Sequence, residues 1–224
     1  MNLFRKVCAV MVMGSVLLSG CVSTVTPNTQ FSGYFDSYRE LKPAQSPSGQ
    51  PVLRWVAPGF NPHRYSTVVF DYLDIYPLPK ATDRIDLQTF DRLQNEASES
   101  ARNALSQHYR VVDSLNAVPV GSKTLILYAA ITGVGAENQG MQWYEAMPLA
   151  AVVGGVAAAT GHRSQHSELY IEAFLVDAET HLPVAKVVRK VFGRDLNNSE
   201  APITADDFTV AINAVTGDLG AFLR

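Results

Sequence analysis

The sequence predicts an α+β fold in which a mostly antiparallel sheet carries two amphipathic helices packed on one face. Two observations predict it. Three segments alternate apolar and polar residues with the period of two that a strand requires, and they are residues 123–132, 168–176 and 184–192. Two other segments place apolar residues three and four apart, and they are residues 86–108 and 204–222. Amphipathic helices beside such strands bury their apolar stripe against the sheet.

The first half of the predicted domain is a loop followed by strand, helix and strand. Residues 42–51 are rich in Pro, Ser and Gly and predict a loop. Residues 67–76 are rich in β-branched and aromatic side chains and stop at Pro77, so they predict a strand. Residues 109–112 predict a second, short strand. Between these strands, residues 86–108 predict a helix with a narrow core face that consists of Phe90, Leu93, Ala97, Ala101 and Ala104.

The second half predicts three longer strands. In the first two alternating segments the more apolar face contains Leu127 and Leu175, so we expect both side chains to point inward. Residues 184–192 return alongside the second segment after a hairpin loop at residues 177–183. One face of this returning strand carries Val187, Arg189 and Val191.

The last predicted element is a helix with a capped N-terminus. Thr204-Ala-Asp-Asp207 resembles a capping box, with an acid in place of the usual Glu or Gln at the third helical position. Asp206 and Asp207 lie in the first turn, where negative charge favours the helix dipole, so capping explains them better than catalysis does. The apolar face behind this cap consists of Phe208, Ile212, Val215, Leu219 and Phe222.

The N-terminus has the order of a secretory lipoprotein signal. The basic pair Arg5-Lys6 precedes an apolar run that ends at Leu18 and is shorter than the roughly 20 residues that span a bilayer. The ending Leu-Ser-Gly-Cys21 resembles the bacterial lipobox, whose Cys is acylated with chains such as palmitate and becomes the first mature residue. We therefore expect residues 1–20 to be a cleaved signal peptide, and residues 21–30 to be the lipidated Cys21 and a polar tether.

The remaining residues 31–224 then form a single α+β domain in the periplasm, because about 200 residues suffice for one well-buried core. Several acyl chains on Cys21 hold a protein firmly to a membrane, whereas one chain holds it marginally. The residue after Cys21 is Val22. Many Gram-negative bacteria retain lipoproteins at the inner membrane through an Asp at this position. We therefore expect a lipid-anchored protein of the outer membrane that faces the periplasm.

Cysteine content and charge exclude several kinds of site. The two cysteines are Cys8, which lies in the expected signal peptide, and Cys21. The mature domain then has no free thiol, so disulfides, Cys-based zinc sites and Cys nucleophiles are excluded. Without residues 1–20 the net charge is −5, since the signal holds two basic residues and no acid. Such a chain has little electrostatic reason to bind nucleic acid.

Three segments together are similar to a known family. They are Phe31-Ser-Gly-Tyr-Phe-Asp-Ser-Tyr-Arg-Glu-Leu-Lys-Pro43, Arg54-Trp55-Val56 and Val68-Val69-Phe70-Asp71. Through them the chain resembles the bacterial lipoproteins grouped as domain of unknown function 3313 (DUF3313), over most of its mature length. The resemblance also leads us to expect an Asp-x-x-Thr-Gly turn between two late strands, where this chain has Thr180-His181. It implies a location in the cell envelope and no activity.

No segment carries a catalytic or cofactor motif of the Gly-x-Ser-x-Gly, phosphate-loop or His-Glu-x-x-His type. His162 and His166 have the spacing of one helix face, and Glu168 is the near candidate for a third metal ligand. However, these residues are polar and precede a predicted strand, so we expect a solvated loop and no metal. Asp71 and Asp74 are three apart on a predicted strand and face opposite sides, so they cannot work as a general acid–base pair.

Residues 146–162 contain no charged residue. Small residues recur every four positions in this segment, as Ala150, Gly154 and Ala158, a pattern that lets helices approach closely. Three interpretations remain open. The segment is a buried crossover under the sheet, an exposed seam that packs against an envelope partner or a second copy, or an element that touches the membrane. Pro148 and the Gly154-Gly155 pair disfavour one continuous spanning helix.

These observations predict a non-enzymatic binding or scaffold lipoprotein of the envelope, with no catalytic residue and no cofactor. The alternative is an envelope hydrolase with a convergent site, because residues distant in sequence also assemble catalytic triads. Trp143, Tyr144 and Glu145, beside the apolar segment, would then line a pocket. A deep cavity with clustered polar groups near them favours the hydrolase, whereas a flat apolar patch favours binding.

Overall fold

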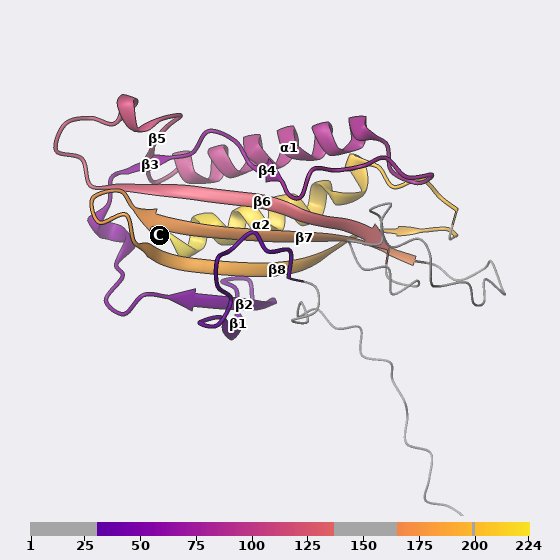
Figure 1. Cartoon of the computed structure of the whole chain (residues 1–224), viewed down its shortest axis with the longest axis horizontal. Helices are drawn as coiled ribbons and strands as arrows, with labels where there is room; N and C mark the ends of the chain where they lie inside the picture. Colours follow the sequence, from indigo (N-terminus) through magenta and orange to yellow (C-terminus); the bar gives the residue numbers. More distant parts are fainter. Residues whose placement is uncertain (1–30, 137–164, 199) are drawn as a thin grey trace, which may run out of the picture.

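The computed structural model describes residues 31–136, 165–198 and 200–224, which form one sheet and two long helices (Figure 1). The helices are α1 (Leu87–Ser106) and α2 (Thr209–Phe222). The strands are β1 (Lys42–Gln45), β2 (Pro51–Val56), β3 (Thr67–Val69), β4 (Asp74–Ile75), β5 (Arg110–Val112), β6 (Thr124–Ala136), β7 (Gln165–Asp177) and β8 (Pro183–Leu196). Short 3-10 turns occur at Pro62–Arg64, Leu115–Ala117 and Ala205–Phe208.

The sheet is mixed, so the predicted α+β class holds but the prediction of a mostly antiparallel sheet is wrong. The strand order is β1-β2-β8-β7-β6-β3-β5, and β4 pairs with β6. In the part of the sheet with the order β1-β2-β8-β7-β6, all neighbouring strands are antiparallel. By contrast, β3 runs parallel to both β5 and β6, and β4 runs parallel to β6. Helix α1 connects β4 to β5, and such a crossover returns the chain to the same end of the sheet. Alternation along a strand reports which face is buried and carries no information about the direction of its neighbour.

The two predicted helices are confirmed, and so is the predicted cap of the second. The carboxylate of Asp86 accepts a hydrogen bond from the Thr89 backbone N–H at 2.7 Å, which caps α1. The Asp207 carboxylate accepts from the Thr204 N–H at 2.8 Å and from its hydroxyl at 3.0 Å. This capping box caps the 3-10 turn at Ala205–Phe208, which leads directly into α2.

Several predicted boundaries differ from the structure. The segment 42–51, predicted as a loop, contains β1 and the turn of the β1–β2 hairpin, and the sheet begins at this edge. Pro43 is compatible with β1 because that strand lies at the edge. The segment 67–76, predicted as one strand, is divided into β3 and β4. The prediction of a short strand at residues 109–112 is confirmed by β5.

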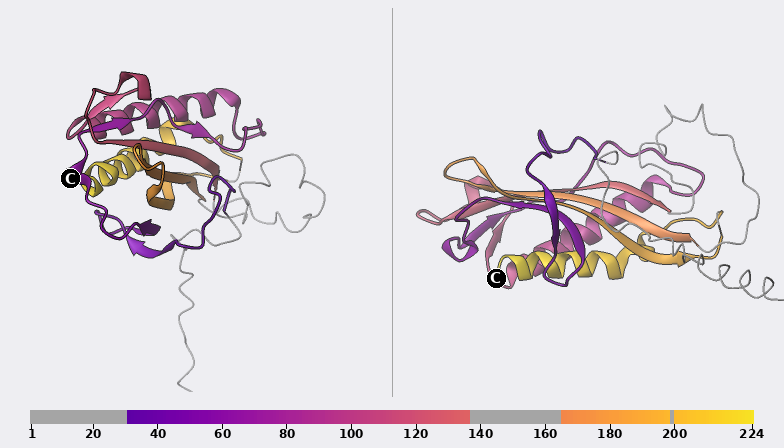
Figure 2. Two further views of the ribbon diagram at one scale, coloured as in Figure 1. Left: turned by 60° about the vertical axis from the view of Figure 1, so that its left-hand side comes forward. Right: turned by 90° about the horizontal axis from the view of Figure 1, so that it is seen from below.

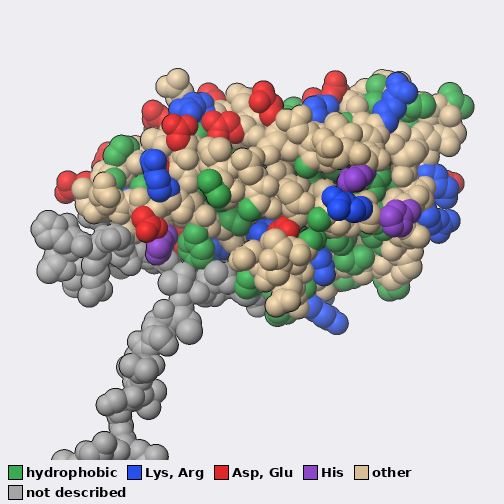
Figure 3. All heavy atoms as spheres, turned by 180° about the vertical axis from the view of Figure 1, so that it is seen from behind, with side chains coloured by type: hydrophobic (Ala, Val, Ile, Leu, Met, Phe, Trp, Pro, Cys, Tyr) green, Lys and Arg blue, Asp and Glu red, His purple; other side chains and the backbone are tan. Residues whose placement is uncertain are grey.

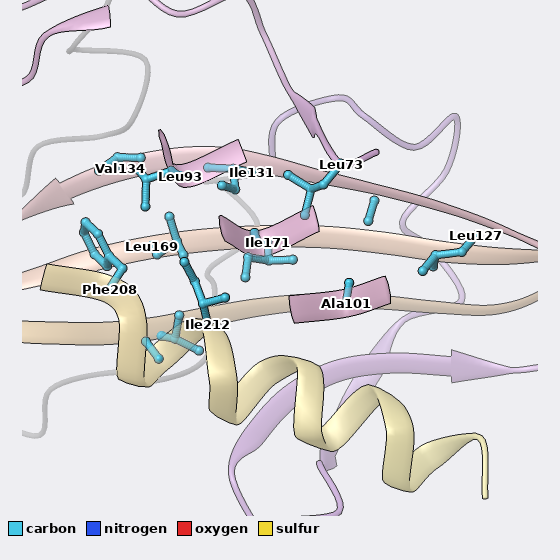
Figure 4. Packing of buried hydrophobic residues seen from close by; sticks show 14 of the residues in the cluster. Leu73, Leu93, Ala101, Leu127, Ile131, Val134, Leu169, Ile171, Phe208 and Ile212 are labelled. Atoms are coloured by element: carbon cyan, nitrogen blue, oxygen red, sulfur yellow. The ribbon is translucent and has the colours of Figure 1, made fainter. Parts of the chain in front are cut away.

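One large core joins both helices to one face of the long strands. Leu127 and Leu175 are 5% and 3% exposed and belong to this core, so the predicted orientation of β6 and β7 is confirmed. Figure 4 shows side chains from β6, β7, α1 and α2 directed toward one another in this layer. Labelled members of the cluster are Leu73, Leu93, Ala101, Leu127, Ile131, Val134, Leu169, Ile171, Phe208 and Ile212.

Residues 31–41 cover part of the other face of the sheet, opposite α2 (Figure 2). Phe35 is buried with Leu53 and Val188, and Phe31 stacks on Tyr38 with 4.3 Å between ring centroids. The buried carboxylate of Glu172 on β7 accepts a hydrogen bond from the Tyr38 hydroxyl at 2.5 Å, which attaches this N-terminal segment to the sheet. No helix among the described residues is long and apolar enough to cross a membrane.

Candidate functional site

Most residues that the sequence singled out lie outside the described part of the chain. They are the lipidation residue Cys21, the seam Ala150, Gly154 and Ala158, the pocket candidates Trp143, Tyr144 and Glu145, and His162. The roles proposed for these residues therefore stay predictions.

The remaining metal and acid candidates are not brought together. His166 lies in β7, which begins earlier than predicted, and its Nδ1 pairs with the Asp195 carboxylate on β8. The Glu168 carboxylate is occupied by Lys190, at 2.8 Å, and by the hydroxyl of the neighbouring Tyr170. Within the described residues no group of three His, Cys, Asp or Glu side chains is placed to hold a metal ion.

Asp71 and Asp74 are also separated. Asp71 is exposed in the connection before β4, whereas Asp74 begins β4 and accepts a hydrogen bond from the Tyr34 hydroxyl at 3.4 Å. Burial and the nearby Asp74 carboxylate raise the pKa of Tyr34 above its usual range.

An apolar cavity of about 120 Å³ lies inside the helix-side layer. Alanines face one another where larger side chains would fill the space, which explains why the cavity exists. They are Ala97 and Ala101 on α1, Ala129 on β6, Ala173 on β7 and Ala185 on β8. The rest of the inner wall includes Leu73, Leu127, Ile171, Leu175 and Ile212. An engineered apolar cavity of about 150 Å³ accepts benzene, so this space accepts a group of about five carbon atoms.

The mouth of the cavity lies between α2 and the β1–β2 hairpin. Its rim consists of exposed Pro47 in the hairpin turn and half-buried Arg54, Val215, Leu219 and Phe222. The guanidinium carbon of Arg54 lies 5.5 Å from the centroid of the Phe222 ring, a cation–π distance. Figure 3 shows this side of the molecule, where hydrophobic side chains reach the surface between charged ones.

A buried ion pair forms one wall of the cavity. Arg189 of β8 donates to the Asp218 carboxylate of α2 at 2.5 Å, and both side chains are less than one-tenth exposed. Asp218 also accepts from the backbone N–H and the hydroxyl of Ser48, both at 2.8 Å. The ion pair therefore joins β8, α2 and the β1–β2 turn beside the mouth.

Burial and hydrogen bonding act in opposite directions on Asp218. Burial raises the pKa of its carboxyl, but hydrogen bonds from Ser46, Ser48 and Arg189 lower it more, so the pKa lies below its ordinary value of 3.8. Asp218 is thus ionised at neutral pH, and its negative charge is balanced by Arg189. The Arg189 Nε, by contrast, is buried and has no hydrogen-bond partner among the described residues.

The alternation of β8 places Arg189 on the same face as Val187 and Val191, and this is the signal that could have found the site. A charged residue in an apolar register requires a buried partner. Asp218 stands between Val215 and Leu219 on the predicted face of the last helix and supplies that partner. The space itself has no sequence signal, because it arises from alanines on four separate elements.

The chain is similar to proteins of one family over most of its length. The model of the family described as "Protein of unknown function (DUF3313)" matches residues 30–219. A protein of Escherichia coli (strain K12) named "Uncharacterized lipoprotein YdcL" is 37% identical over 219 residues, which cover 98% of this chain and 96% of that protein.

Solved structures show weaker similarity. One is a PelC dodecamer from Paraburkholderia phytofirmans, with a TM-score of 0.40, 11% identity and coverage of 75% of this chain and 96% of that chain. Another is a Xanthomonas campestris protein of the family model DUF330, with a TM-score of 0.38, 13% identity and coverage of 75% and 87%. These scores carry no argument about function.

Proposed function

Because the chain belongs to the DUF3313 family of proteins of unknown function, we propose its activity from its own site. It is a lipid-anchored binding protein of the cell envelope whose cavity holds the apolar part of a small molecule. The cavity is the observation that carries this proposal. Apolar pockets with a few placed polar groups are the usual form of small-molecule sites.

The location rests on the N-terminus and on the relative's name. The Leu18-Ser19-Gly20-Cys21 ending provides one acylation site, and the Escherichia coli relative is named a lipoprotein. Val22 after the Cys favours the outer membrane, with the domain facing the periplasm. The membrane contact is then made by lipid on Cys21.

Binding without catalysis agrees with the side chains around the cavity. The polar residues among the described lining are Ser46, Arg54, Lys186, Arg189, Thr216 and Asp218. This set contains no His or Cys, and its one carboxylate is held by Arg189 and Ser48. Ser46 is hydrogen-bonded to that carboxylate, but the described lining has no His to form the Ser–His pair that many hydrolases use.

Affinity for a purely apolar group is modest. A group of about five carbon atoms gains ~4 kcal/mol from burial at ~0.8 kcal/mol per CH₂. That free energy corresponds to a Kd of about 1 mM. Tighter binding requires contacts at the rim.

The test uses the full chain with Cys21→Ser, which carries no acyl chain, and the uncharged fluorescent dye N-phenyl-1-naphthylamine. The phenyl ring of this dye is the part that the cavity admits, and its naphthyl ring would lie at the rim. We expect a saturable rise in fluorescence. Ala101→Leu, which fills the cavity from α1, should weaken dye binding at least about fivefold, the effect of ~1 kcal/mol. The matched control is Ala117→Leu, which adds the same side chain at an exposed position.

Circular dichroism establishes that each variant folds. If Ala101→Leu does not fold, Val215→Trp at the rim takes its place and should have the same effect. Dye binding that does not saturate, or that is equal in the cavity variants and the control, contradicts the proposal.

A further inference from the structure

We propose that the ligand is a single-chain carboxylate, a fatty acid, whose head binds Arg54 and whose tail enters the cavity. This inference rests on the proposed function and adds the chemical class of the ligand. It is carried by the charge at the mouth of the cavity.

Among the charged side chains in the described lining of the cavity, one cation has no counter-charge. Asp218 is neutralised by Arg189. The Lys186 ammonium lies 3.2 Å from the Ser37 carbonyl oxygen and 3.5 Å from the Glu40 carboxylate. Arg54 is half-buried at the rim and forms no ion pair with a described residue. The mouth therefore has charge complementarity with an anion.

The geometry of Arg54 suits a carboxylate. A guanidinium presents parallel N–H donors that match the two oxygens of a carboxylate, and it is more weakly hydrated than an ammonium. The Phe222 ring, 5.5 Å away, supports one side of the group and reduces its contact with water. The Arg189 Nε on the same wall is a second donor without a partner among the described residues.

The apolar residues near Arg54 define the path of the tail. Val215, Leu219 and Phe222 line the rim on one side of α2, and Ile212 of the same helix belongs to the inner wall. A chain whose carboxylate stays at the rim therefore covers these residues first, and its far end fills the space between the alanines. Octanoate has the right form and stays monomeric at useful concentrations.

The experiment compares two amphiphiles with the same heptyl chain and opposite charge, octanoate and heptyltrimethylammonium, as competitors of the bound dye. The net charge of the whole chain is −3, so long-range electrostatics favours the cation. An anion-binding site at the mouth acts in the opposite direction and favours octanoate over the cation. We expect octanoate to displace the dye at a concentration at least about tenfold lower, the effect of ~1.4 kcal/mol.

The variants locate this preference. Arg54→Gln should remove most of the difference between the two competitors, and Arg54→Lys should restore part of it. Arg110→Gln removes the same charge from an exposed position on β5 outside the cavity lining and should leave the preference unchanged. Dye affinity is measured first for each variant, and the two competitors are compared within one variant, so a change in dye affinity does not alter the ratio.

The outcomes separate this inference from the proposed function. Saturable dye binding that both amphiphiles displace equally, that the cation displaces better, or that Arg54→Gln leaves unchanged overturns the fatty-acid assignment alone. Dye that binds but that neither amphiphile displaces overturns it as well. A dye that does not bind at all overturns the proposed function first, and the inference with it.

Discussion

Two buried ion pairs occupy consecutive positions on β8 and serve opposite faces of the sheet. Arg189 pairs with Asp218 on the helix side, whereas Lys190 lies 2.8 Å from Glu168 on the other side. All four side chains are less than one-tenth exposed. Burying a charge away from water costs free energy, which its partner in the ion pair offsets. The loss of one partner therefore leaves an uncompensated buried charge and destabilises the fold.

The first prediction concerns Asp218→Asn. This change leaves the Arg189 guanidinium buried without a counter-charge, and we expect a loss of about 3–5 kcal/mol in the free energy of unfolding. Urea denaturation measures it. The control is Asp113→Asn, because Asp113 forms an exposed pair with Arg102 and its loss should cost less than ~1 kcal/mol. Equal losses in the two variants would contradict the role given to the buried pair.

The pH dependence of stability follows from the same residue. The pKa of Asp218 is lower in the folded than in the unfolded chain, so its contribution is present above the ordinary value of 3.8. It is lost as the pH falls through the lowered pKa. The gap in unfolding free energy between wild type and Asp218→Asn should therefore be constant from pH 7 to about pH 5 and shrink below pH 4. A gap that widens in acid would reverse the sign of the shift.

His181 provides the third prediction, since it is the one described non-glycine residue with a positive φ, of 59°. It occupies the position where the family resemblance leads us to expect Gly. A left-handed backbone costs a residue with a side chain about 1–2 kcal/mol, and a Gly there avoids this cost. Part of the gain is lost because Gly makes the unfolded chain more flexible. We expect His181→Gly to stabilise the fold by ~0.5 kcal/mol, seen as a higher thermal midpoint. Glu179→Gly in the same turn, where φ is negative, should instead destabilise it.

The sequence predicted half of the candidate site at this scale. Periodicity placed Val215, Leu219 and Phe222 on the apolar face of the last helix, and it placed Arg189 on one face of its strand with Val187 and Val191. It did not pair Arg189 with Asp218, because the contact joins residues 29 apart through packing of a helix on a strand. Arg54 had no predicted role at a site. Its position at the cavity mouth depends on the β1–β2 hairpin, and residues 42–51 of that hairpin were predicted as a loop.

At the scale of the elements, β8 passes close to the 3-10 turn before α2 at Gly193. A Cβ atom on Gly193 would overlap the Asp207 carbonyl oxygen and the Ser167 hydroxyl, and would lie 2.8 Å from a ring carbon of Phe208. Only a residue without a side chain permits this approach. The contact brings β8 against the turn that precedes α2.

We therefore expect Gly193→Ala to destabilise the domain by about 1–3 kcal/mol through overpacking. Gly135→Ala on β6 is the matched control, because a Cβ there meets no atom within 4 Å. Thermal melting of the two variants measures the difference. A Gly193→Ala variant that melts like wild type would show that the turn before α2 is free to move.

The elements that sequence predicted well are those with long, regular periodicity. Strands β6 and β7 repeat one pattern over nine or more residues, and their inward faces were identified correctly. The core face of α1 was correct up to Ala101, but Leu105 rather than Ala104 is buried in its last turn. The short strands β3 and β4 have three and two residues, too few to show a period. Their parallel pairing with β6 depends on the α1 crossover, which becomes visible only once the chain is assembled.

For the whole molecule, the N-terminal signal carries the strongest prediction. Cys21→Ser removes the thioether linkage to lipid, so the protein should stay uncleaved or become soluble in the periplasm. Membrane fractionation and the N-terminal sequence of the product measure this. A variant that is cut before residue 21 and remains with the membranes as wild type does would refute the lipoprotein assignment.

The strand order also determines how long β2 waits for its partner strand during synthesis. Strand β2 pairs with β8, and Val56 is matched with Ala185, 129 residues later. At about 5–20 residues per second, the hairpin formed by β1 and β2 waits roughly 6–26 s before its partner is made. During that interval the N-terminal hairpin has an open edge that pairs readily with other chains. A ribosome that stalls before residue 183 would therefore release a chain that is prone to aggregate, although more than four-fifths of the protein has been made.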